Sequence, residues 1–201
     1  YGGPIFYRQQ RLTQHEKPFT LIKFRTMPVY AEEKTGPIWS TAHDSRVLPL
    51  GHFLRHTHLD ELPQLFNILQ GHMSLVGPRP ERLVFVEQFK NSAIKGYCQR
   101  HTVKAGLTGY AQLNWPFARV EHIEQKTNDD LWYITHWNAL LDIKIMLQTA
   151  WQCLQVGLTW PILKTGRTIA AYLKSQWVPL FPLSQTGLQT CAVPVDAPVG
   201  R

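Results

Sequence analysis

The sequence predicts an α+β fold that is mostly helical, in which a small N-terminal β-hairpin precedes a compact set of amphipathic helices. Two short apolar runs separated by a polar turn predict the hairpin. Apolar residues that recur at helical spacing in several later segments predict the helices. With 44% hydrophobic and 17% charged residues, the 201-residue chain can build a core and carries too little charge for a disordered protein.

The hairpin is expected within residues 1–27. YGGPIFYRQQR contains the first apolar run and FTLIKFRTM the second, and a turn is expected around residues 14–18. Residues 28–46 contain Gly36-Pro37 and lack a periodic pattern, so we expect a loop there.

Two helices are predicted next. Leu50, Phe53 and Leu54 fall at helical spacing within residues 49–56. The second helix follows a proline and ends at Gly71, a residue type favoured just beyond a helix. Its predicted apolar face consists of Leu62, Leu65, Phe66 and Leu69.

Three more helices are expected, over residues 81–95, 129–154 and 165–177, with a loop over AGLTGYAQLNWPF between the first two. The chain ends in TGLQTCAVPVDAPVGR, which has no periodicity. We therefore expect one domain over residues 1–177 and an irregular or disordered tail over residues 178–201.

Positive charge predominates, with 21 Lys and Arg against 14 Asp and Glu. A net charge of +7 favours an anionic partner such as nucleic acid, a phosphorylated metabolite or an acidic membrane surface. No helix-turn-helix, zinc-finger or RNP pattern is present, so nucleic acid is not supported. The three cysteines form no CxxC pair, which fits a reducing compartment.

Two stretches lack charges. Residues 145–163 include three Gln, two Thr, a Gly and a Pro, so they are too polar to predict a membrane span. They fit either a core helix with its loop, or an interfacial segment whose Trp151 and Trp160 contact the membrane surface. Three prolines exclude a spanning helix over residues 175–195.

Two adjacent carboxylates, Asp60 and Glu61, stand out in HLDELPQLFN. Pro63 is favoured at the first helical position, which places the pair at or just before a helix N-terminus. One carboxylate could simply cap that helix, but capping leaves the second unexplained. Two carboxylates at an electropositive helix end could instead hold a divalent metal, or one could act as a nucleophile.

Several cations could bind phosphate. Arg79 lies between Pro78 and Pro80, which stiffen the backbone on both sides of it. Lys23 and Arg25 alternate in KFRTM and would share one face of a strand. Further cations of this set are Arg46 and Arg55. Alternatively, Arg79 could lie in an ordinary surface turn, and Lys23 and Arg25 could form a solvated strand face without a ligand.

The combined motifs resemble the bacterial sugar transferase family, the monotopic polyprenyl-phosphate phosphoglycosyl transferases. The resemblance rests on FYRQQR, KFRTM, HDSR, LGHFLRHTHLDELPQL, MSLVGPRPE, GLTGYAQ and DLWYITHWNALLDIKIMLQT, in continuous order over residues 1 to about 154. LDELPQ followed by MSLVGPRPE is far more specific than a single short motif.

This resemblance implies that a sugar 1-phosphate moves from a nucleoside-diphosphate sugar, expected to be a UDP-sugar, to a polyprenyl phosphate such as undecaprenyl phosphate. It assigns Asp60 as the nucleophile, with Glu61 beside it, and Mg²⁺ as the cofactor, which both carboxylates would hold. The expected phosphate-binding residues are Lys23, Arg25, Arg46, Arg55 and Arg79. It further implies membrane-interface helices and a peripheral or monotopic location on the cytoplasmic face of the bacterial inner membrane. We expect attachment to an anionic membrane surface, aided by Trp115, Pro116 and Phe117 in the expected loop.

Some features depart from the family pattern. Family members carry a membrane-embedded helical hairpin just before the segment that begins here at YGGPIF, so the chain is either a fragment or rests on other interfacial elements. His72 stands where the family usually has Asp, and His58 replaces a small polar residue. An inactive or truncated homologue that only binds lipid phosphate or a partner is therefore one alternative. A zinc hydrolase using His52, His56 and Asp60, with His58 nearby, is another.

Overall fold

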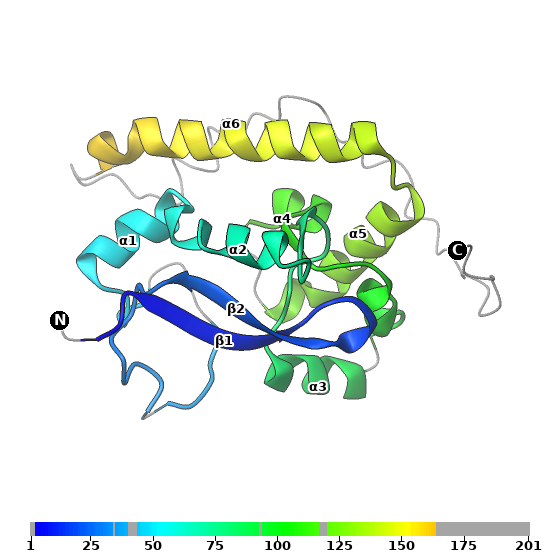
Figure 1. Cartoon of the computed structure of the whole chain (residues 1–201), viewed down its shortest axis with the longest axis horizontal. Coiled ribbons are helices and arrows are strands. Elements are labelled where there is room, and N and C mark those ends of the chain that lie inside the picture. The colour runs from blue at the N-terminus through cyan, green and yellow to red at the C-terminus, as the bar shows by residue number, and fades with distance from the viewer. Residues whose placement is uncertain (1–2, 34, 40–43, 93, 117–119, 164–201) are drawn as a thin grey trace.

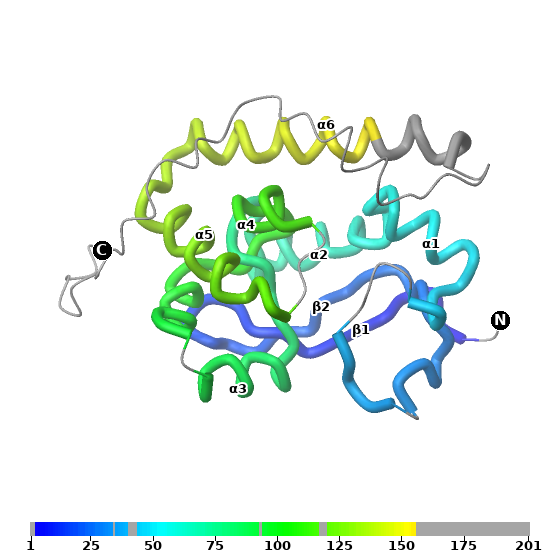
Figure 2. The backbone as a smooth tube through the Cα atoms, turned by 180° about the vertical axis from the view of Figure 1, so that it is seen from behind, coloured from blue at the N-terminus to red at the C-terminus, as the bar shows by residue number. Residues whose placement is uncertain are grey.

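The structure, a computed structural model, describes residues 3–33, 35–39, 44–92, 94–116 and 120–163, with side chains as far as residue 155. It is α+β and mostly helical, as predicted. The helix expected at residues 165–177 and the tail at residues 178–201 lie outside the described residues. Figures 1 and 2 show the elements in layers: α6 (Ala139–Leu163) lies above α1, α2, α4 and α5, the hairpin lies below these, and α3 lies beyond the hairpin.

The predicted β-hairpin is confirmed. β1 (Phe6–Leu12) and β2 (Pro18–Phe24) pair antiparallel, with Tyr7 opposite Lys23. A short 3₁₀ turn, η1 (Gln14–Glu16), closes the tip. The buried side of β2 packs Phe19 and Leu21 against Met73, which ties the hairpin to the segment after α2.

The expected loop over residues 105–117 was a wrong prediction. It contains β4 (Gly106–Thr108), which pairs parallel with β3 (Ser74–Val76), and then α4 (Tyr110–Asn114). The glycines in this segment let its backbone lie close to that of Gly77. A Cβ on Gly106 would lie 2.2 Å from the nitrogen of Gly77, and one on Gly109 would lie 2.2 Å from the Gly77 carbonyl oxygen. Glycine is the residue that permits such contacts.

The first helices match the prediction closely. α1 spans Pro49–His56, and α3 spans Leu83–Asn91 within the predicted 81–95. α2 spans Gln64–Leu69, and Gly71 adopts the left-handed φ of +78° just beyond it, as predicted. Short 3₁₀ turns lie before α2 (η2, Leu59–Glu61), after α3 (η3, Tyr97–Thr102) and before α5 (η4, Val120–His122).

The single helix predicted over residues 129–154 is instead two, α5 (Ile123–Thr135) and α6. The Asn138 side chain accepts the Leu141 N–H (2.9 Å) and so starts α6 anew. Asp142 then accepts hydrogen bonds from Tyr133 Oη (2.7 Å) and Trp137 Nε1 (3.1 Å), which hold the corner. The apolar pattern continues through the corner, but local side-chain capping breaks the helix.

The side of α2 that faces the protein is the opposite of the one predicted. The predicted apolar face is exposed, with Leu69 84% exposed, whereas Gln64 and Asn67 are buried. The Asn67 amide accepts the Ile22 N–H (3.0 Å) and donates to the Thr20 carbonyl (2.8 Å), so it pairs with the backbone of β2 like an extra strand residue. This paired amide explains why the polar side of α2 faces inward.

Candidate active site

Asp60 and Glu61 lie in η2, which leads directly into α2. The residue before the turn, His58, has a left-handed φ of +57°, a strained conformation for a residue with a side chain. The N-cap of α2 is Pro63, which has no capping side chain. The pair therefore sits just before the helix N-terminus, as predicted, and neither carboxylate is the N-cap.

Glu61 is held by Arg79. The two Arg79 Nη atoms donate to the two Glu61 carboxylate oxygens, at 2.6 and 3.4 Å. Burial alone would raise the pKa of Glu61, but the Arg79 guanidinium lowers it to about 2. The Arg79 side chain remains 39% exposed against 12% for Glu61, so the arginine is partly open to solvent while the carboxylate that it binds is largely buried.

Asp60 is buried, at 5% exposure, and no described residue donates a hydrogen bond to its carboxylate. Burial and the neighbouring Glu61 raise its pKa, while Lys23, Arg55 and His58 counter that rise. The Asp60 carboxylate is thus poorly solvated and has cations nearby, an environment in which a carboxylate can act as a nucleophile.

Lys23 and Arg25 share one strand face, as predicted, since both cations lie 5.7 Å from the Tyr7 ring centre. Burial and the nearby Arg11 lower the pKa of Lys23 to about 8, and Asp60 and Glu61 oppose that shift. Arg25 instead donates to the backbone carbonyls of Pro4 (2.8 Å) and Phe6 (3.4 Å). Lys23 therefore belongs to the carboxylate site, and Arg25 fastens the start of β1.

Arg55 and Arg46 also have different surroundings. Arg55 Nε donates to Thr26 Oγ1 (2.7 Å), and burial lowers its pKa while Asp60 raises it. Arg46 binds both carboxylate oxygens of Asp44, at 2.8 and 2.5 Å. The structure thus gathers Lys23, Arg55 and Arg79 around the carboxylate pair and places Arg46 in a local ion pair.

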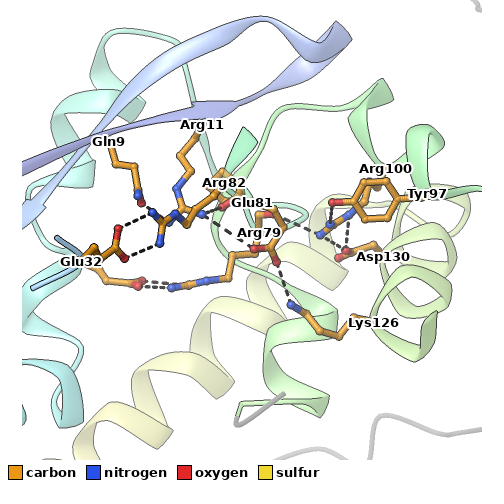
Figure 3. A network of polar contacts seen from close by, with 12 residues as sticks. Gln9, Arg11, Glu32, Arg79, Glu81, Arg82, Tyr97, Arg100, Lys126 and Asp130 are labelled. Carbon is orange, nitrogen blue, oxygen red and sulfur yellow. Dashed lines mark hydrogen bonds and ion pairs between the residues drawn. The ribbon is translucent and has the colours of Figure 1, made fainter. Parts of the chain in front are cut away.

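A buried polar network behind Arg79 was not predicted from the sequence (Figure 3). Lys126 Nζ donates to Glu81 (3.1 Å), and Arg100 donates to Asp130 (2.6 Å). The signal that could have revealed it lies on α5, where Lys126 and Asp130 share the buried face with apolar Ile123 and Tyr133. Charges at such positions need buried partners.

The donor set can be tested for Mg²⁺. Asp60 offers one free carboxylate, whereas both oxygens of Glu61 are engaged by Arg79. Mg²⁺ is usually bound by one or two carboxylates together with substrate phosphates and waters. Asp60 therefore fits as one ligand to a metal that the diphosphate of a substrate would also bind.

The zinc alternative lacks support. Within the described ranges, no group of three or more His, Cys, Asp and Glu side chains is arranged to hold a metal. His72, the departure noted in the sequence, lies beyond the end of α2 with its ring 6.0 Å from that of Phe19.

The aromatic residues expected at a membrane surface differ in how far they are exposed. Trp115 is partly buried, stacks on His122 and donates to Asp129 (3.0 Å), whereas the adjacent Pro116 is exposed. Trp151 on α6 is exposed. Phe117 and the side chain of Trp160 lie outside the described part. No helix in the described part is long and apolar enough to cross a membrane.

Exposed apolar side chains nevertheless gather on α1, η2, α2 and α6, and we call them the outer apolar set. In the segment from α1 to α2 they are Leu50, Leu59, Leu62, Leu65, Phe66 and Leu69, and on α6 they are Leu140, Ile143, Leu147, Trp151 and Leu154. These helices lie on the side of the hairpin opposite α3 (Figure 1).

Comparisons with known proteins show the family to which the chain belongs. The family model for bacterial sugar transferases matches residues 1–156. The chain is 43% identical over 153 residues to the UDP-glucose:undecaprenyl-phosphate glucose-1-phosphate transferase of Escherichia coli, and 45% identical to the protein of that name from Klebsiella pneumoniae; each match covers 75% of this chain and 32% of the relative. It is 37% identical over 148 residues to the UDP-N-acetylgalactosamine-undecaprenyl-phosphate N-acetylgalactosaminephosphotransferase of Aeromonas hydrophila, a match that covers 73% of this chain and 34% of that protein. The matched region thus spans about a third of these relatives, and the chain belongs to the bacterial sugar transferase family.

Proposed function

We propose that this chain transfers a sugar 1-phosphate from a nucleoside-diphosphate sugar to a polyprenyl phosphate, with Asp60 as the covalent nucleophile. The observation that carries the proposal is the contrast within the pair: Glu61 is locked by Arg79, whereas Asp60 is buried and has no hydrogen-bond donor among the described residues. The relatives support the substrate class, since their names specify UDP-sugars and undecaprenyl phosphate.

The proposed reaction has two displacements. An Asp60 oxygen attacks the sugar-bearing phosphorus, the bond to the other phosphate breaks, and a nucleoside monophosphate leaves with the bonding electron pair. A polyprenyl phosphate oxygen then attacks the same phosphorus and releases the Asp60 carboxylate. No net proton transfer is required. Covalent catalysis of this kind lets both substrates use one anion site in turn.

The cations around Asp60 would offset the repulsion between a carboxylate and a diphosphate. Lys23 and Arg55 act on Asp60 electrostatically, and the partly exposed Arg79 side chain would donate to substrate phosphate. When bound, Mg²⁺ would neutralise charge on the diphosphate. Glu61 would then serve chiefly to orient Arg79.

We further propose that the outer apolar set contacts the membrane that holds the polyprenyl acceptor. Apolar side chains on α2 lie immediately after the carboxylate pair in the chain, so lipid contact would bring Asp60 to the interface. The excess of cations would add attraction to anionic lipid, by about 1 kcal/mol for each residue near the surface. This corresponds to a peripheral protein on the cytoplasmic face of the bacterial inner membrane.

A transfer assay tests the proposed function. Labelled UDP-glucose and UDP-N-acetylgalactosamine would be incubated with the chain, Mg²⁺ and vesicles containing undecaprenyl phosphate. Asp60→Asn should lower transfer by several orders of magnitude, on the order of 4 kcal/mol or more in activation free energy. Glu124→Gln, at an exposed acid on α5, is the control and should transfer normally.

Two outcomes would overturn the assignment. Near-native transfer by Asp60→Asn together with loss in Glu61→Gln would reverse the roles of the two carboxylates. Binding of donor and vesicles by the native chain without any transfer would favour an inactive or truncated homologue.

A further inference from the structure

The Arg79 segment is held by its backbone at every residue from Gly77 to Pro80. The Gly77 N–H donates to the Thr108 carbonyl (2.9 Å), and the Gly106 N–H donates to the Pro78 carbonyl (2.9 Å). The two prolines have no N–H to donate, so their segment depends on its carbonyls for anchorage. Among the described residues, no backbone N–H donates to the carbonyls of Arg79 and Pro80, which are bound by side chains instead.

Those two side chains are arginines. Arg100 Nη2 donates to the Arg79 carbonyl (3.3 Å), and Arg11 Nη1 donates to the Pro80 carbonyl (3.0 Å). Figure 3 shows the two guanidinium groups on either side of Arg79 and Glu81. Arg11 reaches the segment from β1 and Arg100 from η3, so two distant parts of the chain fix consecutive carbonyls.

Arg100 is the more firmly held of the two. It is 1% exposed. Its Nε and Nη2 donate to Asp130 Oδ2, at 3.1 and 2.6 Å, and its Nη1 donates to Tyr97 Oη (3.2 Å). The two bonds to Asp130 therefore hold the planar fork in the orientation that directs Nη2 to the Arg79 carbonyl.

We propose that Arg100 is a positioning residue for the transfer reaction: by holding the Arg79 carbonyl it sets the direction in which the Arg79 guanidinium reaches Glu61. The inference takes its catalytic meaning from the proposed function. Its structural content, that Arg100 restrains the side chain of Arg79, can be measured without any transfer.

The direct test is arginine side-chain NMR on the full chain. The Arg79 Nη signals, assigned by their loss in Arg79→Lys, should be separately resolved because the ion pair with Glu61 restricts rotation of the guanidinium. Arg100→Lys keeps a charge for Asp130 but lacks the fork, so these signals should broaden and merge. Tyr97→Phe removes another Arg100 contact and leaves the Arg79 carbonyl bond, so it should keep the resolved signals.

A second variant guards against misfolding. Arg100→Gln combined with Asp130→Asn leaves no unpaired buried charge and also removes the reach to the Arg79 carbonyl. Merged Arg79 signals in either folded variant support the proposal. Averaged Arg79 signals in the native chain, or resolved signals that persist in both variants, would overturn it.

A double-mutant cycle then links the restraint to transfer. Arg100→Lys should lower kcat/KM about tenfold in the native background and less than about twofold when Arg79 is already Lys, because the two residues act through one contact. Equal losses in both backgrounds would indicate a general structural role and contradict the proposal. If Arg100→Lys frees Arg79 but no version of the chain transfers sugar phosphate, the proposed function fails and the restraint stands.

Discussion

Asp60 and Asp130 are both buried carboxylates, 5% and 2% exposed, and burial raises the pKa of each. Asp130 is met by the Arg100 fork at 2.6 and 3.1 Å. Asp60 has cations nearby but no donated hydrogen bond among the described residues. Burial alone thus does not distinguish the structural acid Asp130 from Asp60, for which we propose a reactive role. The difference lies in whether the charge is already paired by the protein or left for a ligand.

The largest expected effect is a difference in the free energy of unfolding between the Asn variants of these two acids. Asp130→Asn should lower the free energy of unfolding by about 3–5 kcal/mol, because it leaves the buried Arg100 without its counter-ion. The same change at Asp60 should leave stability unchanged or higher, because the lost charge was costly to bury. Denaturant unfolding of the two variants makes the comparison, and equal losses would show that Asp60 is paired as Asp130 is.

The next effect concerns the fork on Glu61. Arg79→Lys keeps the charge and loses the two-point geometry, so transfer should fall by roughly 2 kcal/mol, about thirtyfold. Arg82→Lys is a matched control, because Arg82 makes an equivalent fork with Glu32, at 2.7 Å for both bonds. Unchanged kinetics in Arg79→Lys would remove Arg79 from the site.

The buried polar network behind Arg79 should also determine how the stability of the fold falls at acid pH. Burial tends to raise the pKa of Glu81, but Lys126, Arg100 and Arg11 lower it to about 2. Its folded pKa therefore lies below its unfolded value, so its stabilisation is present above about pH 4.5 and is lost as the pH falls towards 2. The slope can reach about 1.4 kcal/mol per pH unit for one proton. The free energy of unfolding should be measured at several pH values between 5 and 2. In Glu81→Gln it should fall less steeply with falling pH than in the native chain. An unchanged slope would show that other groups cause the acid sensitivity.

The smallest effect on stability is expected on the outer apolar set. Phe66→Glu with Leu69→Glu should change the free energy of unfolding by no more than about 0.5 kcal/mol, because both side chains are exposed. The pair should abolish flotation with vesicles containing anionic lipid at low salt. Leu83→Glu with Val84→Glu, at exposed residues on α3 across the hairpin, introduces the same two charges and should still float (Figure 1). Absence of native binding even at low salt would contradict a membrane role for this set.

Much of the fold followed from local patterns. Short apolar runs bounded by turn residues predicted the hairpin, helical spacing predicted α1 and α3, and Gly71 ended α2 as expected. The errors arose where local patterns compete or distant residues meet. Asn138 capped a new helix inside a continuous apolar pattern. The parallel pairing of β3 with β4 joins three-residue strands whose aligned positions, Ser74 and Gly106, are far apart in sequence.

The candidate site shows the same division. The motif predicted that Asp60, Glu61 and Arg79 lie together, and the structure places Arg79 on Glu61. No sequence pattern showed that Arg46 differs from the cations near Asp60. Arg46 pairs with Asp44, only two residues away, and the sequence alone does not show which partner an arginine takes. Arg100 and Asp130 are thirty residues apart, so their pairing depends on the packing of η3 against α5.

The most direct measurement of the central claim is the mass of the chain after incubation with donor and Mg²⁺ but no polyprenyl phosphate. The native chain should gain the mass of one sugar phosphate, on a peptide that contains Asp60, and should lose it when undecaprenyl phosphate is added. Asp60→Asn should gain nothing, while Asp130→Asn, where it folds, should still form the adduct. An adduct on Glu61 or another residue, or full transfer by a native chain that never carries one, would contradict the account.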